Sequence, residues 1–225
     1  MSSLDLNALW LTLRLASLTT LILVLLGMPI AWWLARCRGR IKVVFEAVIA
    51  LPLVLPPTVL GFYLLITLGP NGPLGALSIL WTGRPLAFTF GGLLIGSVLY
   101  SMPFALQPLR DSFASLDETL LEAASTLGAS PLRRFFTVVL PLSRSGLLTA
   151  SVLSFAHTLG EFGVVLMIGG NIPGKTQVLS IAIYDHVEAM EYGAAHGLSA
   201  ALLVFSFALL LLVYSLNRRF NVVHP

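Results

Sequence analysis

Five uncharged, apolar stretches set the strongest limit on what this chain can fold into. Each is long enough to cross the hydrocarbon core of a bilayer, which takes about 20 helical residues. They cover residues 15–35, 47–68, 86–109, 147–168 and 193–216. Strands of a membrane barrel would instead alternate polar and apolar residues over about 10 positions. We therefore expect an all-α bundle with about five transmembrane helices, forming a single domain over residues 1–225.

The composition agrees with a chain embedded in a membrane. Hydrophobic residues make up 57% of the sequence and charged residues 10%. A soluble domain of this size could not cover so much apolar surface. The net charge of +3 is too small to suggest a nucleic-acid partner. The single cysteine, Cys37, excludes an intramolecular disulfide and a cysteine-based zinc site.

Lysine and arginine residues lie mostly on one side of the expected spans. Ten of the thirteen follow the first, third and fifth spans: Arg36, Arg38, Arg40, Lys42, Arg110, Arg133, Arg134, Arg144, Arg218 and Arg219. The other three, Arg14, Arg84 and Lys175, fall on the opposite side. Short loops rich in these residues stay in the cytoplasm. We therefore expect a multi-pass protein of the cell inner membrane, with its N-terminus outside and its C-terminus inside.

The second apolar stretch contains three prolines, Pro52, Pro56 and Pro57. Each removes a backbone donor and disturbs the preceding turn, so this span is expected to be a broken helix. In lipid, freed backbone groups are tolerated where they face protein or a watery cavity. A packing kink and a pathway wall both fit this pattern. Pro56, Pro57 and Thr58 are therefore candidates for a translocation pathway.

A further apolar segment, residues 178–190, is too short to cross a membrane as a helix. It also carries three polar residues that titrate, Asp185, His186 and Glu188. The segment therefore predicts either an interfacial or a re-entrant helix.

Residues 169–176, Gly-Gly-Asn-Ile-Pro-Gly-Lys-Thr, match the pattern G-x-x-x-x-G-K-[ST] of nucleotide-binding loops. In such a loop, backbone donors and Lys175 would hold phosphates. The surroundings argue against this function, because the preceding apolar run continues the fourth span and the charge distribution places the loop outside. No later apolar strand ends in an aspartate that would hold magnesium. We interpret the segment as a turn after a transmembrane helix.

The longest inside connection, residues 110–144, has the pattern of a helix-turn-helix. Its apolar residues have helical spacing up to a break at Gly128. Asp117 and Glu118 precede that run and favour a helix N-terminus. The connection is therefore expected to lie on the inner membrane face.

Within this connection, residues 122–128 (Glu-Ala-Ala-Ser-Thr-Leu-Gly) are followed after nine residues by Val-Val-Leu-Pro at 138–141. This sequence resembles the EAA loop of ABC-importer permeases, whose pattern is E-A-A-x3-G-x9-I-x-L-P. The one departure is Val138, which stands where the pattern has isoleucine. The resemblance implies that residues 110–144 form a cytoplasmic coupling loop, whose helix docks in a groove of a separate ATPase subunit. The residues implied for this contact are Glu122, Ala123, Ala124, Gly128, Leu140 and Pro141.

Other segments resemble the molybdate-type permease: residues 51–57 with 61–63, residues 155–163, and residues 170–177 with 182–184. The resemblance implies the type I, MetI-like permease fold and a transport subunit without catalytic residues or cofactor, not an enzyme. It also implies a homodimer that works with two ATPase subunits and an external protein that delivers the oxyanion. Sulfate-type permeases are similar in part but usually differ in the double-proline stretch. Molybdate is therefore expected first, with sulfate and tungstate as alternatives.

Glu161 is the only carboxylate well inside an expected span. Such a residue is a functional candidate, because burying it without a partner is costly. Its charge would repel a dianion, so a structural or gating role, paired with His157 one turn earlier, is favoured over substrate contact. Hydroxyl side chains could offer donors to oxyanion oxygens, although the same residues commonly pack helices. These hydroxyl candidates are Thr58, Ser97, Ser101, Ser154 and Thr158.

Two other classes of protein compete with the permease hypothesis. The first is a membrane ATPase or enzyme built on residues 169–176, which would bind ATP itself. The second is a secondary transporter, which usually has inverted repeats and coupling carboxylates near the midplane. The chain shows no repeat of fixed period, and this disfavours the second class.

Overall fold

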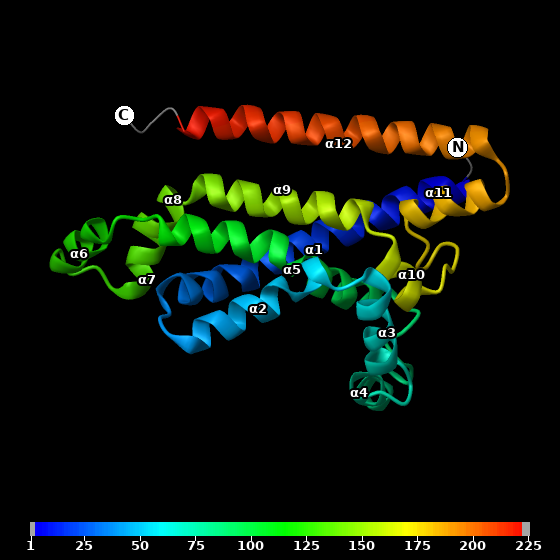
Figure 1. The fold of residues 1–225 in the computed structure, drawn as a ribbon, viewed down its shortest axis with the longest axis horizontal. Coiled ribbons are helices and arrows are strands. Elements are labelled where there is room, and N and C mark those ends of the chain that lie inside the picture. Colours follow the sequence, from blue (N-terminus) through cyan, green and yellow to red (C-terminus); the bar gives the residue numbers. More distant parts are fainter. Residues whose placement is uncertain (1–2, 222–225) are drawn as a thin grey trace.

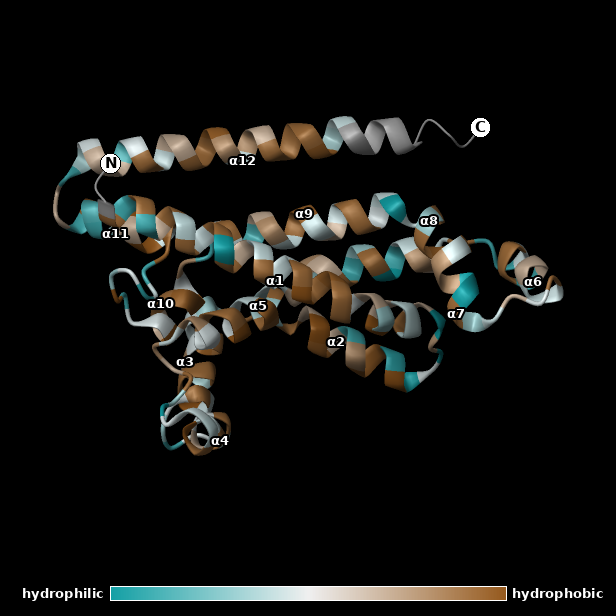
Figure 2. Cartoon of the chain, turned by 180° about the vertical axis from the view of Figure 1, so that it is seen from behind, coloured by the Kyte–Doolittle hydropathy of each residue, from teal (hydrophilic) through white to brown (hydrophobic). Residues whose placement is uncertain are grey.

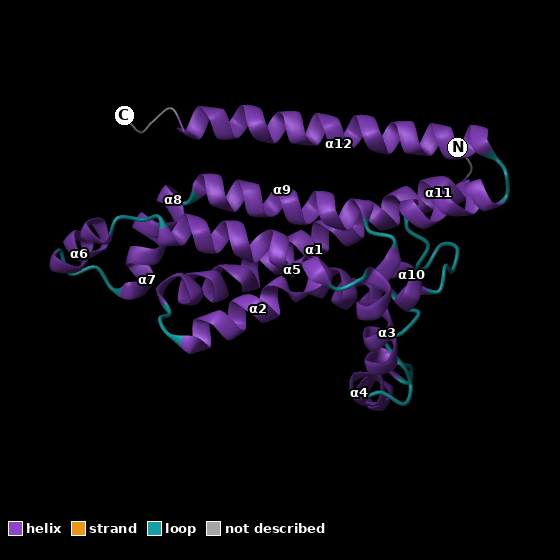
Figure 3. Ribbon diagram, viewed as in Figure 1, coloured by secondary structure: helices purple, strands orange, loops and turns teal. Residues whose placement is uncertain are grey.

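The computed structural model describes residues 3–221, and every regular element in that range is a helix (Figure 3). Three long helices, α1, α5 and α9, pack against one another as the centre of the molecule. A fourth, α12, runs along α9 on the outside (Figure 1). Their bounds are Ser3–Arg36, Phe90–Ala114, Arg144–Gly160 and Tyr192–Asn221. The predicted all-α class is confirmed, while residues 1–2 and 222–225 of the predicted domain lie outside the described residues.

Shorter helices extend this bundle at its two ends (Figure 1). At one end lie α6 (Glu118–Thr126), α7 (Pro131–Arg134), the π-helical turn η1 (Phe135–Val139) and α8 (Leu140–Leu142). Toward the other end lie α3 (Pro57–Leu68), α4 (Pro73–Thr82), α10 (Gly163–Gly169) and α11 (Leu179–Glu188). The remaining helix, α2 (Arg40–Val54), packs along α5.

Length and composition allow α1, α5 and α12 each to cross a membrane. Two bent pairs would raise the number of spans to five: α2 with α3, and the segment Pro131–Leu142 with α9. Apolar residues cover much of the long helices (Figure 2), as contact with lipid requires. On α12, for example, Leu203 is 69% exposed. About five spans, as expected from the sequence, fit this arrangement.

The predicted break in the second span is confirmed. α2 ends at Val54 and α3 begins at Pro57, with a bend of 109° between the two helices. Pro57 occupies the start of α3, where its missing N–H leaves no helical hydrogen bond unmade. α3 consequently leaves the bundle and carries α4 away from it (Figure 1).

The fourth expected span, residues 147–168, is not one continuous helix. α9 ends at Gly160, Glu161 is extended, and α10 begins at Gly163. The carboxylate Oε1 of Glu161 accepts the N–H of Val164 at 2.8 Å, as a helix N-terminal cap does. This local hydrogen bond is the physical reason why an apolar segment of sufficient length divides into two helices.

Buried apolar side chains form two clusters, one toward each end of the bundle. The cluster beside α10 and α11 contains Leu15, Leu64, Leu68, Ala87, Leu93, Val164, Val165, Ile168, Val178 and Ile181. The cluster beside α6 and η1 contains Ala31, Leu34, Ile49, Leu106, Leu109, Phe113, Leu121, Val139 and Ala150. The second cluster therefore joins the predicted coupling loop to the centre of the bundle.

Candidate coupling surface and translocation pathway

The predicted coupling loop forms a short helical hairpin. Asp117 begins it, because its carboxylate accepts the N–H of Thr119 at 2.9 Å and caps α6. This hydrogen bond lowers the pKa of the Asp117 carboxyl. Of the residues on α6, Leu121 is buried, so the helix attaches to the protein along a narrow apolar stripe.

The turn of the hairpin lies at Gly128, as predicted. Gly128 has a left-handed backbone with φ of +78°, and its N–H donates to the carbonyl of Ser125 at 2.9 Å. Glycine adopts this conformation without a steric penalty, so the chain can reverse directly after α6. Ser130 then caps α7 by accepting the N–H of Arg133 at 3.3 Å.

The two halves of the EAA pattern occupy different environments. Glu122 and Ala123 are exposed on α6, and Ala124 is half-buried. Leu140 and Pro141 are half-buried in α8, close to the start of α9. The helices α6 and α7 of the hairpin are linked to each other, since Nη1 of Arg134 donates to the Oγ of Ser125.

Four exposed apolar side chains on this hairpin escaped the sequence analysis. Their exposed fractions are 47% for Leu120, 87% for Leu127, 70% for Leu132 and 56% for Phe136. The signal was present in the sequence, because two of them flank the Gly128 turn, where polar residues are usual. We call these four residues the apolar hairpin patch. Such an exposed apolar patch is typical of a protein-binding surface.

An aromatic cluster connects the hairpin to the long helices. The ring of Phe135 on η1 lies 5.6 Å from that of Trp32 on α1 and 6.1 Å from that of Phe113 on α5. Trp32 and Phe113 also meet edge to face at 5.6 Å. The Arg36 guanidinium covers Trp32, with its Cζ 3.4 Å from the ring centroid. The cluster thereby joins the hairpin directly to two of the long helices, α1 and α5.

At the other predicted site, two interrupted helices meet at their breaks. A Cβ added to Gly163, at the start of α10, would lie 2.6 Å from the Cβ of Pro57, at the start of α3. Only glycine permits this approach. The pathway candidates Pro56 and Pro57 therefore lie next to the break that contains Glu161. Thr58, on the first turn of α3, is exposed.

The expected pair between Glu161 and His157 does not form, and that prediction is wrong. The Glu161 carboxylate caps α10 instead, and its main-chain carbonyl accepts the hydroxyl of Ser180 on α11 at 2.5 Å. The Nδ1 of His157 forms a hydrogen bond with the Oγ of Ser101 on α5, at a distance of 2.9 Å. The Glu161 carboxylate therefore bonds to the start of α10, and the Nδ1 of His157 bonds to a residue that is remote in sequence.

The hydroxyl candidates lie mostly inside the bundle. Ser154 donates to the carbonyl of Ala150 at 2.7 Å, and Thr158 donates to the carbonyl of Ser154 at 2.9 Å. Both residues are buried, as are Ser97 and Ser101. Ser97 Oγ has no hydrogen-bond partner among residues 3–221. The geometry of Ser154 and Thr158 is that of helix-packing residues.

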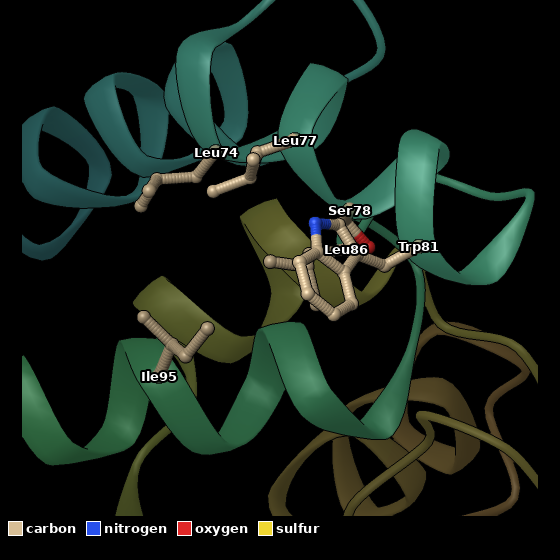
Figure 4. Close-up of a pocket in the computed structure, with 6 residues that line it drawn as sticks. All are labelled: Leu74, Leu77, Ser78, Trp81, Leu86 and Ile95. Carbon is tan, nitrogen blue, oxygen red and sulfur yellow. The ribbon is translucent and has the colours of Figure 1, made fainter.

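Several open cavities lie on the surface of α5, and two of them differ clearly in their lining. One, of about 390 Å³, is lined by Leu53, Pro103, Phe104, Gln107, Pro108, Asp111 and Leu153, so it combines apolar walls with polar groups. The other, of about 320 Å³, lies under α4, where Leu74 and Leu77 face Ile95 across the groove (Figure 4). Ser78 is the one polar residue of this second groove, which therefore offers little to an anion.

The loop at residues 169–176 has a different construction from a phosphate-binding loop. A helix, α10, precedes it, and no strand occurs within residues 3–221. The N–H groups of Lys175, Thr176 and Gln177 all donate to the carbonyl of Ile172. Asp185 on α11 accepts from the side-chain amides of Asn171 and Gln177, which holds the loop closed. These donors are used inside the loop, as the turn interpretation requires.

A family model described as the inner membrane component of binding-protein-dependent transport systems matches residues 18–222. The chain belongs to this family. Proteins of this family are transport subunits, and the EAA-type hairpin and broken helices described above are therefore found in a permease. The expected fold and class of function, a permease and not an enzyme, are confirmed.

Several curated relatives cover most of the chain. The molybdenum transport system permease protein ModB of Azotobacter vinelandii is 59% identical over 217 residues, 96% of each chain. ModB of Escherichia coli (strain K12) is 38% identical over 191 residues, 84% of this chain and 83% of that one. A probable sulfate transport system permease protein of Zygnema circumcarinatum is 34% identical over 208 residues, 92% of this chain and 72% of that one.

Solved structures of importers share the fold of this permease. A bacterial ABC transporter that imports the acidic polysaccharide alginate has a chain that matches with a TM-score of 0.72 at 17% identity, covering 100% of this chain and 82% of that one. The MetNI methionine ABC transporter matches with a TM-score of 0.72 at 15% identity, covering 98% of this chain and 99% of that one. The expected MetI-like permease fold is confirmed.

Proposed function

We propose that this chain is the membrane-spanning permease subunit of an ABC importer for molybdate, driven by ATP hydrolysis on a separate subunit. The assignment of molybdate as the substrate rests on the 59% identity to the Azotobacter vinelandii molybdenum permease over 96% of both chains. The identity to a sulfate permease is 34%, so sulfate is the second candidate. Tungstate is a third, because it is also a tetrahedral dianion.

The working assembly contains two copies of this chain, two copies of a cytoplasmic ABC ATPase and an external oxyanion-binding protein. Isologous pairing is the commonest symmetry of homo-oligomers, and about five spans enclose little space on their own. The ATPase contacts Glu122, Ala123, Ala124 and Gly128 together with the apolar hairpin patch, while Leu140 and Pro141 join this surface to α9. Support comes from the exposure of the patch and the aromatic link behind it.

The translocation pathway runs past the place where the breaks of α2/α3 and α9/α10 meet. Broken transmembrane helices are tolerated where backbone lines a cavity or is buried in protein, and transport sites commonly use them. Pro56, Pro57 and Thr58 contribute from one break. Ser154, His157, Thr158 and Glu161 contribute from the other, with Glu161 acting as a structural group that holds α10.

The N-terminus lies outside the cell membrane and the C-terminus in the cytoplasm. In support, α1 begins at the end of the bundle opposite to α6 and α7, whereas α12 ends on their side (Figure 1). Lys175 is exposed on the 169–176 loop at the outer end. In a Cys37→Ser background, Lys175→Cys is expected to react in whole cells with a membrane-impermeant thiol reagent, and Lys175→Ala to retain uptake. Protection of that cysteine together with lost uptake would contradict this topology.

The proposed function is tested by reconstitution in proteoliposomes with a partner ABC ATPase and an oxyanion-binding protein. We expect ATP-dependent uptake of radioactive molybdate and competition by unlabelled molybdate and tungstate. The same vesicles are tested with radioactive sulfate. Uptake of sulfate in preference to molybdate would show that sulfate is the substrate. Uptake without the ATPase would contradict the assignment as an ABC permease.

A further inference from the structure

His157 is held rigidly by aromatic rings at the level of the helix break. Its imidazole stacks on Phe104 of α5, with the ring centroids 4.0 Å apart and the planes inclined by 24°. Tyr100, one turn earlier on α5, packs against the same imidazole, with the two ring centroids 4.9 Å apart. Two aromatic contacts fix the plane of the ring, so its nitrogens point in defined directions.

Hydrogen bonding leaves one nitrogen of this ring available. Nδ1 lies 2.9 Å from the Oγ of Ser101, which lies 2.9 Å from the Oγ1 of Thr158. Thr158 donates its proton to the carbonyl of Ser154. All three contacts are satisfied when Ser101 donates to Thr158 and Nδ1 donates to Ser101. Nε2 then carries a lone pair, and it has no hydrogen-bond partner among residues 3–221.

The ring is also close to an open cavity. Phe104, on which His157 stacks, and Leu153, one helical turn before His157 on α9, both line the 390 Å³ cavity between α2, α5 and α9. His157 itself is half-buried. A part-exposed polar nitrogen at membrane depth is costly against lipid, which favours a position facing water or protein.

We propose that Nε2 of His157 is a contact for the transported oxyanion, an inference that rests on the proposed function. As the dianion arrives, Nε2 takes a proton from a hydronium ion in the pathway, which leaves a neutral water molecule, and the new N–H donates to an oxyanion oxygen. The proton returns to water when the anion leaves. The ionisable groups near the ring are Tyr100 on α5 and Glu161 one turn further along the chain, and the Glu161 carboxylate is already engaged with Val164.

This arrangement suits transport because a permanent cation would hold a dianion and slow its release. A neutral ring that becomes charged only beside the anion gives a contact of limited duration. The fixed Nδ1 bond to Ser101 keeps the ring in place in both states, since Nδ1 is a donor in both.

The first test compares uptake of molybdate by His157→Phe and His157→Gln, each normalised to the amount of assembled complex. His157→Phe keeps the ring that stacks on Phe104 but has no donor, and we expect uptake to fall by roughly tenfold or more, as for loss of a hydrogen bond to a charged group. His157→Gln keeps a donor and is expected to fall less. Equal uptake by wild type and His157→Phe would overturn the inference.

The second test does not depend on transport by the variant. In a Cys37→Ser background, His157→Cys in the assembled complex is treated with a negatively charged, membrane-impermeant thiosulfonate, with and without molybdate. We expect labelling that molybdate slows, whereas Leu159→Cys, at a position 2% exposed, stays unlabelled. Absence of labelling at position 157 would overturn the inference. A wild-type complex that moves no molybdate would refute the proposed function instead, so the two failures are distinguishable.

Discussion

Phe135 meets Trp32 edge to face with the ring centroids 5.6 Å apart, although six helices, α2 to α7, separate the two residues along the chain. This contact joins the coupling hairpin to α1, and Phe113 extends it to α5. The hairpin otherwise attaches through a narrow stripe on α6. The aromatic cluster therefore connects the hairpin, whose patch we propose as the ATPase contact, to two of the long helices.

Removal of this connection is expected to uncouple transport. Phe135→Ala deletes three aromatic pairs, with Trp32, Phe113 and Phe136, each with a contribution of about 0.5–1.5 kcal/mol beyond area burial. We expect ATP-dependent uptake to fall by roughly tenfold while the ATPase still co-purifies through the apolar hairpin patch. Phe45→Ala is the matched control, because it removes the Trp33–Phe45 pair at the other face of α1. Unchanged uptake in Phe135→Ala would show that the hairpin acts on the bundle by another route.

Gly128 offers a test that separates backbone conformation from steric contact. A Cβ at this position would meet no atom within 4 Å, so a substitution acts through the φ of +78° alone. Valine in this region costs about 1–2 kcal/mol and should reorient the end of α6. We expect Gly128→Val to insert into the membrane but to lose uptake and stimulation of the ATPase.

Gly128→Asn is the control for that variant, because asparagine tolerates the left-handed region. It should retain most of the uptake. If Gly128→Val retained both activities, the assignment of the coupling turn would be wrong.

Glu161 is expected to stabilise the protein without contacting substrate. Glu161→Ala leaves the buried N–H of Val164 without its acceptor, which should lower the free energy of unfolding by about 1–2 kcal/mol. Glu161→Gln keeps an acceptor oxygen and should remain close to wild type in both melting temperature and uptake. Thermal unfolding in detergent measures the first effect. Loss of uptake by Glu161→Gln at unchanged stability would indicate that the charge itself is required.

The end of the bundle that carries α11 should respond to pH through His186. Its Nε2 lies 3.0 Å from Asp5 on α1, and its Nδ1 lies 2.8 Å from Glu191 before α12. These hydrogen bonds, first to Asp5 and then to Glu191, raise the pKa of His186 above its ordinary value of 6.5. The folded protein therefore holds this proton more tightly than the unfolded chain does.

The resulting stabilisation is complete below pH 6.5 and is lost as the pH rises through the raised pKa. Melting temperatures measured in detergent from pH 6 to about pH 9 should fall for the wild type. The fall should be smaller for His186→Gln, while His196→Gln, at an exposed position of α12, should behave as the wild type. An identical pH response in His186→Gln would contradict the role of this contact.

The order of helices and the coupling hairpin followed from local features of the sequence. Uncharged stretches of about 20 residues predict membrane helices because lipid cannot hydrogen-bond to an exposed backbone. Prolines at 52, 56 and 57 predicted the broken helix, and Asp117 and Gly128 predicted where α6 begins and ends. Each of these effects acts within one or two helical turns, so the neighbouring residues are sufficient to specify it.

The long-range partners of the polar residues were decided by the tertiary structure alone, whereas the bond from Glu161 to Val164 is local. Helical spacing placed His157 and Glu161 one turn apart, yet the break at Glu161 moves the carboxylate to Val164, and packing of α9 on α5 brings Ser101 to His157. His186 and Asp5 are 181 residues apart and meet because α11 packs on α1. A hydrogen-bonding group takes the nearest partner in space, and hydropathy along the chain contains no information about which distant group that is.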